Sequence, residues 1–107
     1  MPTFGHQASD FLQHNLIVPM LYQLFQSVGS EADFNELLNL TFTENEREMM
    51  LERWRIFDAL DRGLSQREVS KQVPCSIVTA TRGAKVFREN KAAIQKLLPI
   101  WRNGGQN

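Results

Sequence analysis

Residues 62–83 read RGLSQREVSKQVPCSIVTATRG, and this stretch decides the fold. Ser65 and Glu68 stand three residues apart, the spacing at which a serine hydroxyl and a glutamate carboxylate cap each other's backbone amides at a helix N-terminus. Gly63, just before them, suits the left-handed conformation that ends a preceding helix. The pattern therefore predicts one helix that ends at Gly63 and a second that runs from Ser65 to about Val73.

A further helix follows in the same stretch. Pro74 cannot continue a helix, and Ser76 is a favourable N-cap for a helix that we expect to run to Asn90. Two helices of about two and four turns, joined by a brief connection, have the dimensions of a helix-turn-helix. The side chains spaced to bury the contact between them are Val69, Val73, Ile77, Ala80 and Phe87. Such pairs also occur in ordinary helical bundles, and the pattern alone leaves both interpretations open.

The second helix of the pair has the residues of a DNA-reading helix. Ser76, Val78 and Thr79 are small enough to approach thymine methyls and phosphates, and Arg82 and Lys85 follow them.

Gly83 stands inside this otherwise favourable helix, where a glycine costs roughly 1 kcal/mol relative to alanine. One interpretation is that a ligand or a phosphate approaches the backbone closely beside Arg82. The other is that an exposed helix surface simply tolerates the glycine.

The helix before Gly63 has its own capping box in Thr43 and Glu46, which predicts a helix over residues 44–62. Its apolar face is expected to consist of Met50, Trp54, Phe57 and Leu60, with Met49 and Ile56 beside it.

The remaining segments are patterned as helices too. Apolar residues recur every three to four positions over 8–28, where Pro19 is expected either to kink the helix near Asn15 or to start a second helix. A short helix is expected with Glu31 and Asp33 in its first turn and its end near Leu40, and an amphipathic helix is expected over 91–101. No segment shows the alternation typical of strands, and the fold class is all-α. The tail from Gly104 to Asn107 is expected to be disordered.

Length and composition fit one compact domain. The chain has 107 residues, of which 42% are apolar and 22% charged, as in ordinary globular proteins. Its single cysteine, Cys75, cannot form an internal disulfide and suits a reducing compartment. No signal peptide or membrane-length apolar run is present, which favours a cytoplasmic protein without a membrane partner.

The charges cancel overall but are segregated along the chain. Residues 1–61 hold ten acidic and three basic residues, whereas residues 62–107 hold nine basic and two acidic ones. The C-terminal part can therefore attract phosphate, although a lopsided set of solvated helix faces would look the same.

Enzymatic and metal chemistry find no support in the sequence. His6 and His14 have no acidic or cysteine neighbours at ligand spacing, and Cys75 has no histidine nearby along the chain. No glycine-rich phosphate loop is present. We expect neither a catalytic residue nor a bound metal.

The sequence resembles the bacterial Trp repressor family over roughly residues 34–90. The matching residues, in order, are Leu37 to Leu40, Thr43, Glu46 to Glu48, Arg53, Arg55, Ile56, Arg62, Gly63, Ser65 to Glu68, Thr79 and Thr81 to Gly83.

This resemblance implies an intertwined all-helical homodimer of about six helices per chain, built from a single domain that spans residues 1–107. Residues 8–62 would form the dimerisation core, 65–90 the helix-turn-helix reading head and 91–103 a C-terminal helix.

The resemblance also implies a corepressor, L-tryptophan. Its indole would lie between Arg53 and Arg82, with Arg82 also holding the carboxylate. Guanidinium groups can stack on an aromatic ring and neutralise an anion, as this arrangement requires. The complete implied site is Leu40, Phe42 and Thr43 of the other subunit with Arg53, Arg82, Gly83 and Val86.

The implied second partner is a double-stranded DNA operator. The residues at the DNA-contacting positions are Gln66, Arg67, Ile77, Val78, Thr79, Thr81, Arg82, Gly83 and Lys85. The resulting hypothesis is a tryptophan-responsive repressor that reads a pseudo-palindromic operator.

The sequence departs from the family pattern at several positions. The linker between Gly63 and Ser65 is one residue short, Pro74-Cys75-Ser76 replaces a glycine-rich turn, and Ala84-Lys85 replaces a Ser-Asn pair. Val86 stands where a serine commonly meets the ammonium of the ligand.

Two alternatives follow from these departures and from the charge pattern. One is a DNA-binding dimer of the same fold that uses another ligand or none. The other is a helical protein-interaction module whose basic face binds an acidic partner.

Overall fold

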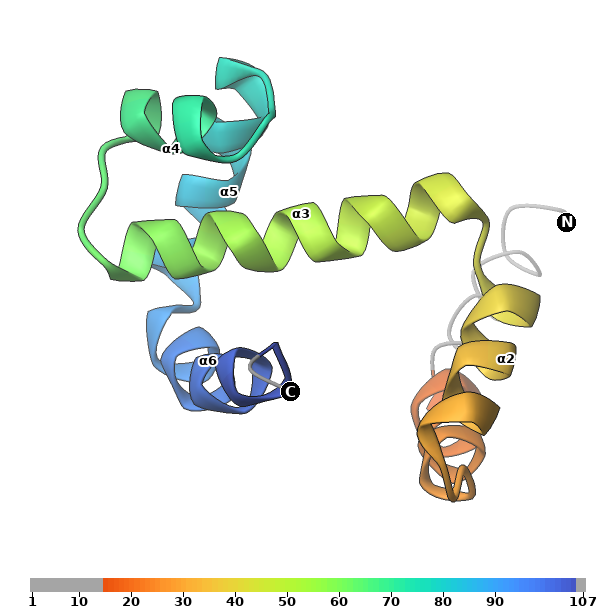
Figure 1. Cartoon of the computed structure of the whole chain (residues 1–107). Helices are drawn as coiled ribbons and strands as arrows, with labels where there is room; N and C mark the ends of the chain where they lie inside the picture. Colours follow the sequence, from red (N-terminus) through yellow and green to blue (C-terminus); the bar gives the residue numbers. More distant parts are fainter. Residues whose placement is uncertain (1–14, 106–107) are drawn as a thin grey trace, which may run out of the picture. The chain divides into compact units, whose positions relative to one another are not determined.

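The computed structural model describes residues 15–105, and every regular element in that span is an α-helix (Figure 1). The labelled helices are α2 (Glu31–Thr41), α3 (Glu44–Asp61), α4 (Gln66–Gln72), α5 (Ile77–Glu89) and α6 (Lys91–Gly104), and residues 15–26 are helical as well. The predicted all-α class is confirmed. None of these helices is long and apolar enough to cross a membrane.

The chain divides into two compact units, with the boundary between Phe42 and Thr43. The expectation of a single domain with a dimerisation core over 8–62 stays a prediction.

The helix over residues 15–26 runs through Pro19. Because the fixed φ of proline is itself helical, the chain stays helical on both sides of it. The alternative in which a second helix starts at Pro19 is therefore wrong. The expected start of this helix at residue 8, together with His6 and His14, lies outside the described residues.

The N-terminal unit buries no side chain among its described residues, 15–42. Seven large apolar side chains of its first helix each expose between 42% and 65% of their surface: Leu16, Ile17, Val18, Met20, Leu21, Tyr22 and Leu24. This many exposed apolar side chains on one short helix favour an interaction surface. Within the unit, Ser30 caps α2 by accepting a hydrogen bond from the amide of Asp33 at 3.1 Å.

Both predicted capping boxes are present in the C-terminal unit, one at the start of α3 and one at the start of α4. The amide of Glu46 donates to the Thr43 hydroxyl at 3.1 Å, and the Thr43 amide donates to the Glu46 carboxylate at 2.9 Å. Ser65 and Glu68 repeat this exchange at the start of α4, with both distances 3.2 Å. Between the boxes, Gly63 adopts a φ of +91°, as its role in ending α3 requires.

The helix pair α4 and α5 packs on α3 through one apolar cluster. Its buried members are Ile56, Ala59, Val69, Val73 and Ala80, with Leu60, Leu64 and Cys75 packed against it. Val69, Val73 and Ala80 fill the contact as predicted, whereas Ile77 exposes 51% of its surface and does not. On α3, Ile56 and Ala59 are more deeply buried than Met50, because α4 and α5 cover that side of the helix.

Gly83 allows α5 to approach α3 closely. A Cβ atom at this position would lie 2.7 Å from Cγ2 of Ile56, which is closer than side-chain carbons pack. The glycine is therefore required for packing, and tolerance of an exposed surface is not the reason for it.

Helix α6 closes the other side of α3. Phe57, Ile94 and Leu98 form the buried part of this second cluster, and Trp54, Phe87 and Trp101 pack around them. The rings of Trp54 and Phe57 meet edge to face at a centroid distance of 5.3 Å. Phe87 belongs to this cluster and not to the α4–α5 contact that the sequence predicted for it. Helix α6 also extends beyond the expected end, to Gly104, and the last two residues of the expected tail lie outside the described residues.

A polar network fastens α6 to the end of α3. Arg102 donates to Asp58 at 2.6 Å and to Asp61 at 3.0 Å, and the Gln95 amide donates to Asp61 at 2.8 Å. The hydrogen bond from Gln95, followed by that from Arg102, holds the pKa of Asp61 below its ordinary value.

We predict that Gly83→Ala lowers the free energy of unfolding by about 1–3 kcal/mol, because the new methyl group overlaps Ile56. Chemical denaturation at a fixed protein concentration measures the change. The matched control is Gly104→Ala, a helical glycine with open space around it, which should not destabilise the protein. Equal stabilities of the two variants would contradict the proposed close contact.

We predict a stabilising contribution of Asp61 that depends on pH. The pKa of the Asp61 carboxyl is lower in the folded state than in the unfolded state, so its ionised form stabilises the folded protein. This stabilisation is complete above about pH 4, the ordinary pKa of the group, and is lost as the pH falls through the pKa in the folded state. The difference in unfolding free energy between the wild type and Asp61→Asn should therefore be larger at pH 7 than at pH 2.5. An equal difference at both pH values would contradict the stabilising role of the ionised Asp61 carboxylate.

Candidate functional site

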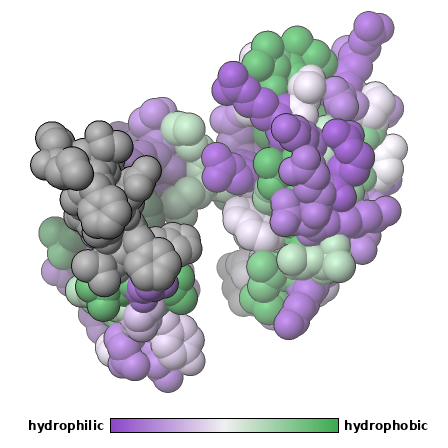
Figure 2. Space-filling model, turned by 180° about the vertical axis from the view of Figure 1, so that it is seen from behind, coloured by the Kyte–Doolittle hydropathy of each residue, from purple (hydrophilic) through white to green (hydrophobic). Residues whose placement is uncertain are grey.

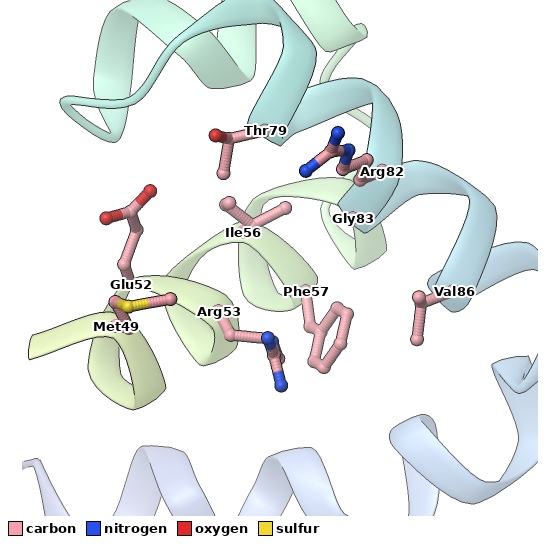
Figure 3. A pocket seen from close by; sticks show the side chains of 9 residues that line it. All are labelled: Met49, Glu52, Arg53, Ile56, Phe57, Thr79, Arg82, Gly83 and Val86. Carbon is pink, nitrogen blue, oxygen red and sulfur yellow. The ribbon is translucent and has the colours of Figure 1, made fainter. Parts of the chain in front are cut away.

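A cleft of about 480 Å³ opens between α3 and α5, within the C-terminal unit (Figure 3). Its lining residues are Met49, Glu52, Arg53, Ile56, Phe57, Thr79, Arg82, Gly83 and Val86. Sites for small molecules typically have volumes of roughly 300–1,000 Å³ and apolar walls with a few polar groups. The cleft has both properties.

Helical periodicity positions every residue of the cleft. The α3 residues lie at steps of three or four along one face, from Met49 to Phe57, and the α5 residues do the same from Thr79 to Val86. The two faces are held opposite each other by the contact of Gly83 with Ile56, which forms the floor of the cleft.

Arg53 and Arg82 line the same cleft from opposite helices. In Figure 3, Arg82 comes from α5 and Arg53 from α3, with Ile56 and Phe57 near them. Both arginines are exposed, and no described carboxylate lies within salt-bridge distance of either guanidinium. Guanidinium groups stack on aromatic rings and hold carboxylates with paired hydrogen bonds, so this pair suits a planar aromatic anion or zwitterion.

Two more of the expected ligand residues lie here as well. Gly83 is part of the floor, and Val86 contributes an apolar wall that exposes 43% of its surface. Thr79, which the resemblance assigned to DNA, also lines the cleft.

Besides Thr79, four lining residues were not predicted as ligand residues: Met49, Glu52, Ile56 and Phe57. The sequence contained a signal for them, because counting three and four positions from Arg53 in both directions reaches Met49, Met50, Ile56 and Phe57, of which all but Met50 line the cleft. Glu52 is adjacent to Arg53 and one turn from Met49 and Ile56.

The remaining expected ligand residues, Leu40, Phe42 and Thr43, lie around the boundary between the two units. Leu40 exposes 81% of its surface, and Thr43 caps α3. They were expected to reach the ligand from a second subunit, and this expectation stays a prediction.

The start of α5 presents apolar side chains to solvent. Ile77 exposes 51% and Val78 56% of its surface, and Thr79 beside them is exposed too. The Ser76 hydroxyl caps the helix by accepting from the amide of Thr79 at 3.1 Å. Exposed methyl groups on a first helical turn match the surface that contacts thymine methyls in the major groove.

The Thr81 hydroxyl is already engaged within the protein. It lies 3.0 Å from Oε1 of Gln66 and 2.7 Å from the carbonyl oxygen of Ile77. A hydroxyl has a single proton, and both neighbours are acceptors, so no proton is left to donate to a phosphate. Thr81 therefore ties α4 to α5 and orients the Gln66 amide.

Exposed cations accompany these two helices. Arg67 on α4 and Lys85 on α5 are both exposed. Figure 2 shows one face of the C-terminal unit as largely hydrophilic with smaller hydrophobic areas.

Comparison with known proteins extends the resemblance. The family model described as "Trp repressor protein" matches residues 18–99. A "Trp operon repressor homolog" of Vibrio vulnificus strain YJ016 is 36% identical over 74 residues, which cover 64% of this chain and 72% of that protein. A protein of the same description from Xylella fastidiosa strain M23 is 33% identical over 72 residues, which cover 66% of this chain and 78% of that protein.

No solved structure matches the chain. The family match nevertheless includes the whole of α2 to α5, both cleft-forming faces and most of α6. The chain belongs to the Trp repressor family.

Proposed function

We propose that this protein is an L-tryptophan-responsive transcriptional repressor that binds a pseudo-palindromic DNA operator as a homodimer in the cytoplasm. The observation that carries the proposal is the presence of Arg53 and Arg82 in one cleft whose other wall is the DNA-reading helix α5. Family membership supports the role in transcriptional regulation.

In this proposal the indole ring lies between the two guanidinium groups, against the apolar side chains of the cleft. Arg82 also holds the carboxylate of the ligand. Gly83 and Val86 form the α5 wall, and Leu40, Phe42 and Thr43 of the partner subunit close the site.

The surface of the N-terminal unit supports the proposed homodimer. The apolar side chains between Leu16 and Leu24 are exposed in the single chain, and a second copy would remove them from water. Leu97 and Ile100 add exposed apolar surface on α6, at 45% and 70%. The interfaces of permanent dimers are typically rich in apolar side chains.

The mechanism is geometric. A twofold dimer reads two half-sites only when its reading helices lie about one DNA turn, roughly 34 Å, apart. Helix α5 is both a wall of the cleft and the DNA-reading helix. A ligand that binds more tightly to the protein in one of two arrangements of α5 therefore increases the fraction of molecules in that arrangement. By reciprocity, DNA must then strengthen the binding of the ligand.

In the DNA complex we assign Ile77, Val78 and Thr79 to base edges and Arg67 and Lys85 to phosphates. Gln66 and Thr81, together with Arg82 and Gly83, complete the expected contact surface. Thr81 supports DNA binding by orienting Gln66, because the proton of its hydroxyl is already donated within the protein.

The second candidate is a DNA-binding regulator of this family that uses another ligand or none. It is favoured by Val86, which offers no hydrogen-bond acceptor where a serine commonly meets the ammonium. It predicts DNA binding that is indifferent to tryptophan.

Arg82→Ala should weaken the binding of L-tryptophan by about tenfold or more, because a charge-assisted hydrogen bond to the carboxylate is lost. Isothermal titration calorimetry of the folded dimer measures the change. Arg88→Ala is the matched control, since Arg88 is an exposed arginine of α5 outside the cleft. A titration of the wild type without heat and without saturation would remove tryptophan as the ligand.

Lys85→Ala should reduce the slope of log affinity for DNA against log salt concentration by about one, because one phosphate contact is lost. Thr81→Val should weaken binding but leave this slope unchanged. The measurement is fluorescence anisotropy with a duplex selected from random sequences in the presence of tryptophan. An unchanged slope for Lys85→Ala would mean that Lys85 does not contact a phosphate.

A further inference from the structure

Glu52 is a third charged side chain in the cleft, and the proposed binding of indole and carboxylate leaves it without a role. It lies on α3 next to Arg53 and is partly buried. Figure 3 shows its carboxylate directed from α3 toward Thr79, near the start of α5, whereas Arg82 lies one turn farther along α5. Glu52 is the single carboxylate among the residues that line the cleft.

The simplest structural role for Glu52 would be to neutralise the two arginines. The described ion pairs do not support this role, because none of them joins Glu52 to Arg53 or Arg82. No hydrogen bond of the Glu52 carboxylate with another described residue is formed either, although its charge helps to raise the pKa of Cys75, after the burial of that thiol. The carboxylate is therefore open to a ligand.

An unpaired carboxylate in the cleft has opposite effects on two classes of aromatic ligand. It repels a ligand whose only charge is a carboxylate, even though the arginines attract it. A zwitterionic amino acid avoids this conflict, because its ammonium group needs acceptors and can use Glu52. The charges of the cleft thus match a molecule that carries both signs.

The placement of the groups fits such a molecule. An α-amino acid carries its carboxylate and its ammonium on one carbon, so their protein partners must lie close to the same point of the cleft. Arg82 and Thr79 are one turn apart on α5, and Glu52 lies on the facing helix α3. The Val86 side chain offers no polar atom to the ammonium, and Glu52 on α3 is the charged acceptor among the residues that line the cleft.

We propose that Glu52 binds the α-ammonium group of the ligand and makes the cleft selective for an amino acid over its desamino analogue. This inference rests on the proposed function, in which the ligand is L-tryptophan. It assigns Glu52 a direct contact with the ligand and explains how the site recognises an ammonium group without a serine at position 86.

The test compares L-tryptophan with indole-3-propionate, which has the same ring and carboxylate but no ammonium. Calorimetry with the full-length dimer gives both dissociation constants for the wild type, Glu52→Gln and Glu48→Gln. Glu48 is the matched control, because it is an exposed glutamate of α3 one turn before Glu52 and outside the cleft. Thermal unfolding shows that the variants are folded.

The wild type should bind L-tryptophan more tightly than indole-3-propionate. Glu52→Gln should weaken the binding of tryptophan by about tenfold, which corresponds to one charge-assisted hydrogen bond, and should leave the binding of indole-3-propionate equal or stronger. Glu48→Gln should change neither constant.

Two results would overturn the assignment, and they are distinguishable from failure of the proposed function. If Glu52→Gln weakens the binding of both ligands equally, Glu52 only shapes the cleft. If it weakens the binding of neither ligand, the carboxylate does not contact the ligand. If the wild type binds neither compound, tryptophan recognition itself fails, and the role of Glu52 falls with it.

Discussion

The close contact between α3 and α5 at Gly83 and Ile56 is the constraint on which the rest of the C-terminal unit depends. A glycine on one helix lets the other approach to a distance that even a methyl group would prevent. Beside this contact, the same helical faces carry Arg53, one turn before Ile56, and Phe57, next to Ile56. On α5, Thr79 and Val86 lie one turn to either side of Gly83. The packing of the helices and the shape of the cleft therefore have a single physical cause.

This arrangement gives α5 two functions in the proposed repressor. One face packs on α3 and lines the cleft, and the first turn exposes Ile77 and Val78 for DNA. In this proposal a ligand between the helices would act on the DNA-reading surface through α5 alone, without a long chain of intermediate residues. The fastening of α6 to α3 by Arg102 and Asp61 holds the other side of α3 fixed.

The sequence predicted the features that depend on local chemistry. Both capping boxes, the left-handed Gly63 and the bounds of α3, α4 and α5 follow from residues that lie within a few positions of each other. The two arginines were recognised through the family resemblance, and α3 and α5 place them in one cleft. Ile77 was expected both in the contact between the two helices and on the DNA-contacting surface, and the residues alone could not decide between these places. The reason for Gly83 could not be predicted either, because it depends on which helix packs against α5 in three dimensions. Glu52 was missed because an acidic residue on a helix resembles any solvated charge until the opposite wall of the cleft is known.

In the proposed repressor, a ligand in the α3–α5 cleft and DNA on α5 bind cooperatively. The most direct measurement is the thermodynamic cycle: the affinity for an operator duplex with and without saturating L-tryptophan, and the affinity for L-tryptophan with and without the duplex. We expect that each partner strengthens the binding of the other by the same factor, of about 5- to 150-fold. A DNA affinity that does not change when tryptophan saturates the protein would contradict it.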